Sequence, residues 1–413
     1  TEGFNCSYRL VAEYVAVKKK ELQLKKRDGF IPLVHYPGEA QADFGEAAFY
    51  LKGKSYTGKY LVLSFPHSNA GYLQLKYGEN LECLLESMKT IFEYLEGVPK
   101  EIWFDNASSM VTKIIRDGGR DLTERFIYFR EHYGFKAIFM NPASGWEKGS
   151  AEGKVGYNRR NMLVPIPRIL DLDDYNTKLL TECDEDFERD HYRVDALIST
   201  LFKEDKEALL PLPAVPFDTA LYEPAKTNGW GKFHLNKGLH TYSVSPAYDE
   251  VAVNLKITSE TVTVMTLDNE EIITHKRLYG NTKQESMEWL PYLKYIARKP
   301  RSLKNSGIYT MMPENMQYFM DKCESKEKGK ALKVLSELTD RTGFDSAIQT
   351  VSQAILYQSH DADSLENLYR RLYSDVPELP PMKHHSGIPH MKEMSTNLVS
   401  YDHLLRKRGA ANG

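Results

Sequence analysis

The first half of the chain alternates between the two-residue and the helical spacing of apolar positions. From Leu81 to Leu95 the spacing is helical, Asn80 is a favourable cap, and Gly97 ends the run. Tyr72–Tyr77 alternates as a strand does. The same reasoning predicts strands at 40–51, 60–64, 72–77, 101–104 and 136–140, and helices at 81–95 and at 122–133 capped by Asp121. A further helix is expected between the loop 141–145 and the prolines that follow Val164. This order predicts an α/β fold, with helices packed on a mixed sheet.

The second half changes character twice. A helix capped by Asp171 is expected over 171–193, followed by a proline-rich linker over 209–216. Five short strands at regular spacing then predict a small β-barrel, with strands at 230–235, 240–244, 250–257, 261–266 and 271–275. From residue 281 onward, helical patterns return at 289–296, 316–344, 347–357 and 363–373.

Three acidic residues stand at the edges of predicted elements in the first half. Asp43 lies in the first strand, Asp105 follows the strand 101–104, and Glu152 lies on the last helix of the core. Carboxylates are the oxygen ligands that divalent cations prefer, and a pair of such cations suits phosphodiester chemistry. The sequence therefore predicts a metal-dependent site formed by these three residues.

Three motifs carry a resemblance to a known family. They are Gln41-Ala42-Asp43-Phe44-Gly45, Phe104-Asp105-Asn106, and the long run from Asn141 to Asn161, which includes Gly149-Ser150-Ala151-Glu152-Gly153-Lys154. Together they resemble the IstA-type transposases of bacterial insertion sequences, which have a ribonuclease-H-like DDE core similar to that of retroviral integrases. The resemblance implies a remnant helix-turn-helix domain at 1–17, a basic linker at 18–36, a catalytic domain at 37–165, a helical connection at 166–216, a small β-barrel at 217–279, a helical C-terminal domain at 280–382 and a flexible tail at 383–413.

The resemblance also implies a mechanism and partners. Asp43, Asp105 and Glu152 would hold two Mg²⁺ ions, replaceable by Mn²⁺, at a separation of about 3.5–4 Å. Water and then a DNA 3′-hydroxyl would attack phosphodiester bonds, so that element ends are cleaved and joined to target DNA. Glu147 is the alternative to Glu152 as the third ligand. Expected partners are the terminal repeats and target as double-stranded DNA, further copies in a dimer or higher multimer, and an AAA+ ATPase helper of the IstB type.

Charge distribution bears on the DNA contacts more than the net charge of −3 does. Basic side chains gather in the linker and around Glu152. Trp146 is either a packing residue or a base-stacking one. The residues expected to contact DNA are Ser7, Tyr8, Arg9, Lys18, Lys19, Lys20, Lys25, Lys26, Arg27, Trp146, Lys148, Lys154, Arg159 and Arg160.

Composition excludes several other classes. The four cysteines form no CxxC pair, which argues against a zinc ribbon or a disulfide scaffold. No apolar run reaches membrane length, so we expect a cytoplasmic protein with no membrane partner. The resemblance further implies a bacterial, nucleoid-associated protein. Two alternatives stay open: a catalytically inactive DNA-binding scaffold whose acids are structural, and a ribonuclease-H-like nuclease.

Overall fold

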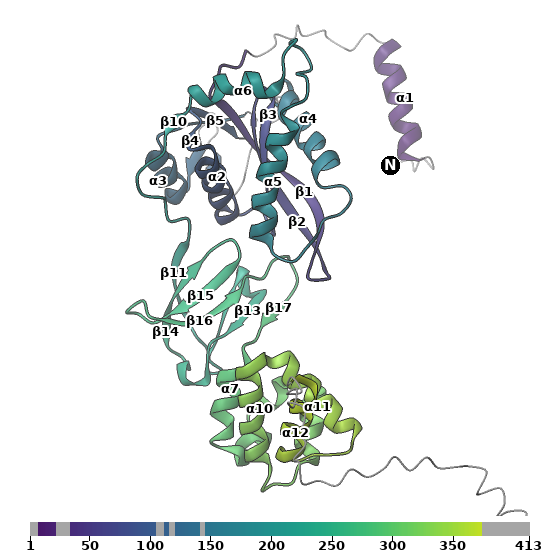
Figure 1. Ribbon diagram of the computed structural model, residues 1–413, viewed down its shortest axis with the longest axis vertical. Helices are drawn as coiled ribbons and strands as arrows, with labels where there is room; N and C mark the ends of the chain where they lie inside the picture. The colour runs from purple at the N-terminus through teal and green to yellow at the C-terminus, as the bar shows by residue number, and fades with distance from the viewer. Residues whose placement is uncertain (1–6, 22–33, 105–110, 115–119, 141–144, 374–413) are drawn as a thin grey trace, which may run out of the picture. The chain divides into compact units, whose positions relative to one another are not determined.

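The computed structural model describes residues 7–21, 34–104, 111–114, 120–140 and 145–373 (Figure 1). The chain divides into two compact units, Thr1–Ile296 and Ala297–Gly413. The first unit contains a mixed sheet with its helices and a second, β-rich part. The second unit is helical.

The central sheet has the strand order β3-β2-β1-β5-β8, and β9 pairs with the end of β1. The first three strands are antiparallel, whereas β5 and β8 run parallel to β1. The strands are β1 (Glu39–Leu51), β2 (Lys54–Phe65), β3 (Ala70–Lys76), β5 (Glu101–Phe104), β8 (Lys136–Phe139) and β9 (Arg168–Ile169). This order and these directions are those expected of a ribonuclease-H-like core, so the predicted α/β fold class is confirmed for this part of the chain.

Helices gather around this sheet in Figure 1: α2 (Leu81–Leu95), α3 (Glu124–Tyr133), α4 (Gly145–Met162), α5 (Leu172–Asp186) and α6 (Ile198–Glu207). The Asn80 side chain accepts a hydrogen bond from the Cys83 amide at 3.0 Å, which is the predicted cap of α2. At the sheet edge, the Asn176 side chain of α5 bonds both the N–H and the C=O of Leu75. Because these two groups of strand β3 have no neighbouring strand, Asn176 satisfies them.

Two helix predictions need correction. Asp121 does not cap a helix, because it lies in β7 (Arg120–Leu122), which pairs with β6 (Val111–Ile114); α3 begins only at Glu124. The predicted helix 171–193 is capped by Asp171 but ends at Asp186, and α6 follows it. The apolar spacing of α6 is interrupted because a charged residue, Asp205, occupies one of its buried positions. The Asp205 carboxylate accepts a hydrogen bond from the Gly38 amide at 2.8 Å.

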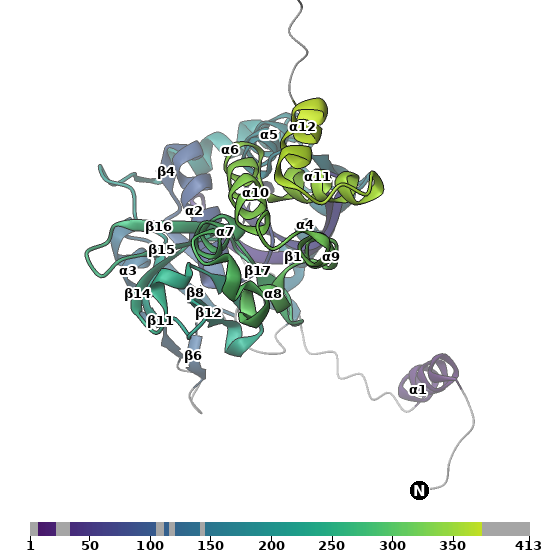
Figure 2. The same cartoon turned by 90° about the horizontal axis from the view of Figure 1, so that it is seen from below.

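The β-rich part, here called the β module (221–286), contains two open sheets. Figure 2 shows the first, with the order β11-β14-β15-β16, and the second has the order β12-β13-β17. The strands are β11 (Leu221–Lys226), β12 (Lys232–Leu235), β13 (His240–Ser243), β14 (Ala252–Ile257), β15 (Thr261–Met265), β16 (Glu271–Lys276) and β17 (Gln284–Ser286). Phe233 and Tyr242 of the second sheet share an apolar cluster with Leu255 and Val264 of the first. Closure into the predicted barrel is therefore not confirmed, although all five predicted strands are present.

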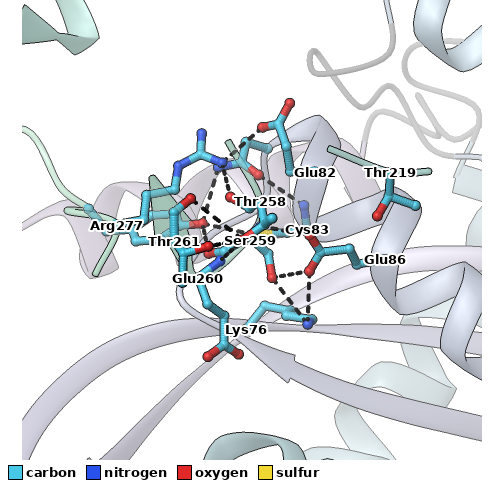
Figure 3. Close-up of polar contacts among 12 residues, drawn as sticks. Lys76, Glu82, Cys83, Glu86, Thr219, Thr258, Ser259, Glu260, Thr261 and Arg277 are labelled. Carbon is cyan, nitrogen blue, oxygen red and sulfur yellow. Dashed lines mark hydrogen bonds and ion pairs between the residues drawn. The ribbon is translucent and has the colours of Figure 1, made fainter. Parts of the chain in front are cut away.

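Buried charges join the β module to helix α2 (Figure 3). Glu82 accepts hydrogen bonds from Arg125 of α3 and, at 3.1 Å, from Arg277. Glu86 accepts from the Ser259 amide at 2.7 Å and also from its hydroxyl. Glu82 is only 4% exposed, so these contacts replace water around the carboxylate rather than add to it.

The second unit begins with η3 (Pro300–Asn305) and α8 (Gly307–Met311), and continues with α9 (Glu314–Lys322), α10 (Lys328–Thr342), α11 (Phe344–Leu356) and α12 (Ala362–Tyr373). The predicted helix 316–344 is thus two helices, α9 and α10. Phe319, Leu332 and Leu365 are fully buried in this unit. The predicted tail 383–413 lies outside the described residues.

Helix α1 (Tyr8–Glu21) covers the predicted recognition helix but runs past residue 17, so Lys18–Lys20 belong to it rather than to a linker. In the part of the chain that the structure describes, no helix is long and apolar enough to cross a membrane. Cys83, Cys183 and Cys323 are buried free thiols.

Candidate active site

Asp43 lies on β1, where the parallel pairing with β5 reaches its end. Ala42 is opposite Phe104 on β5, and Asp43 itself is opposite Val62 on β2. The carboxylate is half-buried, and its Oδ1 accepts a hydrogen bond from the Phe44 amide at 2.8 Å. The strand pairing therefore fixes Asp43 on a rigid part of the sheet.

The other two predicted ligands are described only in part. Asp105 follows Phe104 in the sequence but lies outside the described residues, as do Asn106 and the loop 141–144. Glu152, like its alternative Glu147, lies on α4, but their side chains are not described. Among the described side chains, no group of three or more His, Cys, Asp or Glu is placed to hold a metal ion. The described side chains do not include those of Asp105 and Glu152.

Tyr60 of β2 connects the strand of Asp43 with helix α4. Tyr60 is opposite Gly45 on β1, and a Cβ at Gly45 would lie 2.1 Å from Tyr60 Cζ. The ring therefore crosses the strand where no side chain stands, and its hydroxyl donates to the Val155 carbonyl at 3.0 Å. Burial raises the pKa of the Tyr60 phenol, Arg159 of α4 lowers it, and Asp43 raises it. The pKa of the Tyr60 phenol therefore depends both on the Asp43 carboxylate of the sheet and on Arg159 of the helix.

Lys154, a predicted DNA contact, occupies a different place from the one expected. It is 6% exposed, and its Nζ donates to the Asn69 carbonyl at 2.7 Å. The stem passes close to strand β3, since a Cβ at Gly71 would lie 2.9 Å from Lys154 Cε. Burial, together with the nearby Arg189 guanidinium, lowers the pKa of the ammonium to about 8, although Asp186 acts in the opposite direction. Lys154 thus holds helix α4 to the β2–β3 turn inside the protein.

The next turn of α4 is held by the acidic end of α5. The Tyr157 hydroxyl donates to Asp186 at 2.6 Å, and Arg189 binds the same carboxylate at 3.1 Å. The Arg189 guanidinium also lies 4.5 Å from the centre of the Tyr157 ring. Asp184 accepts from Tyr72 of β3 and from Tyr94 of α2.

The remaining predicted DNA contacts fall into three groups. Arg159 and Arg160 are exposed in the last turn of α4. Arg9 and Lys18 are exposed on α1, and Ser7 is exposed directly before it. The side chains of Tyr8, Lys19, Lys20, Trp146 and Lys148 are not described, although their backbones are helical. Lys25, Lys26 and Arg27 lie outside the described residues.

Sequence reasoning missed Tyr60, Asp186 and Arg189. One signal was present: Gly45 sits in a strand, where a glycine indicates the close approach of another group. The Tyr60 hydroxyl that uses this space comes from the neighbouring strand, and no local pattern identifies it.

No protein-family model matches the chain. It is 27% identical, over 436 aligned residues, to the transposase for insertion sequences IS1326/IS1353 of Pseudomonas aeruginosa, covering 99% of this chain and 82% of that protein. A transposase of Aminobacter aminovorans is 27% identical over 76% of this chain and 63% of its own length. This chain is a homologue of insertion-sequence transposases. The resemblance seen in the sequence is confirmed, and so is the expected enzyme class.

The chain is also similar to an IS21-like transposase of Bacteroides fragilis, with 26% identity over 39% of this chain and 31% of that protein. Among solved structures, the integrase catalytic core domain of HTLV-2 in complex with magnesium covers 42% of this transposase homologue and 99% of that chain, with 18% identity and a TM-score of 0.27. A simian T-cell lymphotropic virus intasome covers 67% and 96%, with 13% identity and a TM-score of 0.31. The strand order and strand directions of the central sheet carry the ribonuclease-H-like fold, because both TM-scores are below 0.5.

Proposed function

We propose that this protein is a DDE transposase that binds insertion-sequence ends, cleaves their 3′ ends and joins them to target DNA. The observation that carries the proposal is the pairing of Ala42 with Phe104 on adjacent parallel strands. The residues that follow them in the sequence are Asp43 and Asp105. Helix α4, which carries Glu152, is hydrogen-bonded to the same region through Tyr60.

The donors fit a hard divalent cation. Mg²⁺ and Mn²⁺ take carboxylate oxygens, and Asp43, Asp105 and Glu152 supply only these. When bound, two such ions would lower the pKa of the attacking water or 3′-hydroxyl and stabilise the leaving oxygen. This chain's own part would be to hold the three carboxylates, with Asp43 on β1, Glu152 on α4 and Asp105 next after β5 in the sequence. No serine, tyrosine or cysteine nucleophile is required for such a direct displacement.

Exposed Arg159 and Arg160, on the same helix as Glu152, would bind DNA phosphates near the site. In this proposal the protein acts as a dimer or higher multimer, because two element ends must be joined, and an AAA+ helper of the IstB type is a further partner. Its place of action is the bacterial cytoplasm, at the nucleoid.

The test is strand transfer from a short duplex with a pre-cut element end into target DNA, with Mg²⁺ or Mn²⁺. Wild-type protein should give joined products that require the metal, and Asp105→Asn should reduce them by at least about 100-fold, since removal of a metal ligand removes a transition-state interaction. The matched control is Asp268→Asn, an exposed carboxylate of the β module, which should leave the rate unchanged.

Calorimetric Mn²⁺ titration completes the test. Binding that is present in wild type and weakened in Asp105→Asn supports the proposal. Equal transfer by wild type and Asp105→Asn would overturn it, and so would absence of both transfer and Mn²⁺ binding, which would instead favour the inactive scaffold.

A further inference from the structure

Helix α4 has little apolar surface with which to hold its position. Its sequence has glycines at 145, 149, 153 and 156 and contains no continuous apolar stripe. Among its described side chains, Val155 and Met162 pack against the core and are only partly buried. Polar contacts of the residues after Glu152 must supply the rest.

Two such contacts follow Glu152 directly. Lys154, two residues later, binds the Asn69 carbonyl, and Val155, three residues later, receives the Tyr60 hydroxyl. Val155 is three residues after Glu152, so the carbonyl that accepts the Tyr60 bond lies about one helical turn from Glu152 along α4. Both partners belong to β2 or to the turn after it, and β2 is paired along its length with the strand of Asp43.

We propose that Tyr60 and Lys154 are positioning residues that hold α4 in register with β1 and thereby set the reach of Glu152 toward Asp43. This inference rests on the proposed function and deepens it. Gly45 is needed for the Tyr60 contact, because a Cβ at this position would collide with the Tyr60 ring. It also gives Lys154 a role inside the fold in place of a DNA contact.

Loss of the Tyr60 hydroxyl and loss of the Lys154 ammonium should change the free energy of unfolding in different directions. Tyr60→Phe removes one hydrogen bond and keeps the ring. Lys154→Met keeps the stem but removes a buried ammonium, whose desolvation is costly. A purely structural lysine would be revealed by loss of stability and activity together. A positioning lysine predicts that Lys154→Met folds at least as stably as wild type and yet transfers DNA more slowly.

The experiment measures strand transfer by the full chain at saturating DNA and Mg²⁺, together with DNA affinity and thermal midpoint. Both variants should lose about 10- to 100-fold in rate, as expected for misplacement of a catalytic group by a fraction of an ångström to about 1 Å. DNA affinity should stay within about twofold, and the half-saturating Mg²⁺ concentration should rise. Tyr292→Phe is the matched control, because it removes a tyrosine bond of the same kind, to the Trp230 carbonyl at 2.8 Å, away from α4.

Wild-type rates in both variants, measured beside an inactive Asp105→Asn, would overturn the positioning role and leave the proposed function intact. Loss of DNA affinity in Lys154→Met with an unchanged rate at saturation would also overturn it, and would restore Lys154 as a DNA contact. If Tyr60→Phe does not fold, Lys154→Met decides alone.

Discussion

Helices α2 and α4 pack against the same sheet, but different interactions hold them. The side chains of Leu84, Leu85 and Phe92 on α2 are at most 1% exposed, and each such side chain contributes about 1.5–3 kcal/mol through burial. On α4, hydrogen bonds from Tyr60 and Tyr157 take this place, and each contributes about 0.5–1.5 kcal/mol net. The comparison teaches that α4, which carries the proposed metal ligand Glu152, can be placed by a few directional contacts, whereas α2 forms part of the general core.

The largest effect is expected in the apolar helix. Phe92 is fully buried against Phe129, Tyr133 and Phe135, so Phe92→Ala should lower the free energy of unfolding by about 3–5 kcal/mol. Urea denaturation measures this, and Glu93→Ala, at an exposed position of the same helix, should change it by less than about 0.5 kcal/mol. A loss below about 1 kcal/mol for Phe92→Ala would break the distinction between the helices.

A smaller loss of stability is expected at the ion pairs that Glu82 of α2 makes with Arg125 and Arg277. Glu82→Gln removes the shared carboxylate of Arg125 and Arg277, and it should cost about 2 kcal/mol because both cations are partly exposed and can recover some hydration. Glu96→Gln, at an exposed site, is the control. A stability equal to that of wild type in urea would show that the β module is not held to α2 by this contact.

The smallest effect is the contribution of Lys154 on α4 to the pH dependence of stability. Burial lowers the pKa of folded Lys154 to about 8, below that of the unfolded side chain, so above pH 8 the unfolded state binds more protons and this group makes stability rise with pH. The slope contributed is on the order of 1 kcal/mol per pH unit, up to the onset of tyrosine ionisation. Asp186, Arg189 and Cys183 face the ammonium and modulate it. Chemical denaturation at pH 8 to 9.5 should show this rise in wild type but not in Lys154→Met, and identical slopes would contradict it.

The same contrast explains what the sequence allowed us to predict. The boundaries of α2 and the existence of the main sheet strands follow from apolar spacing and from Asn80, because burial leaves a periodic pattern. The prediction of 60–64 for β2 was too short, since that strand begins at Lys54. The existence of α4 was predicted from its position and its motif, not from periodicity. Its anchors, Tyr60 and Asp186, are separated from it in the sequence, and a hydrogen bond between distant residues leaves no local pattern.

The burial of two charged residues could not be predicted from the sequence for a related reason. Lys154 and Asp205 look like surface residues, yet both are buried and bonded to backbone groups. A charge in the core is rare enough that sequence reasoning places it outside. Asp43 was predicted in a strand and lies there, whereas the assembly of Asp43, Asp105 and Glu152 into one metal site stays a prediction.

The central claim, that polar contacts rather than burial place α4, is tested most directly by amide hydrogen exchange in wild type and Tyr60→Phe. Amides of α2 should exchange only with global unfolding in both proteins. In wild type, the amides of residues 155–162 should exchange through a smaller opening, and Tyr60→Phe should accelerate them about 10-fold while leaving α2 unchanged. Equal protection of the two helices, or equal acceleration of both by Tyr60→Phe, would contradict the account.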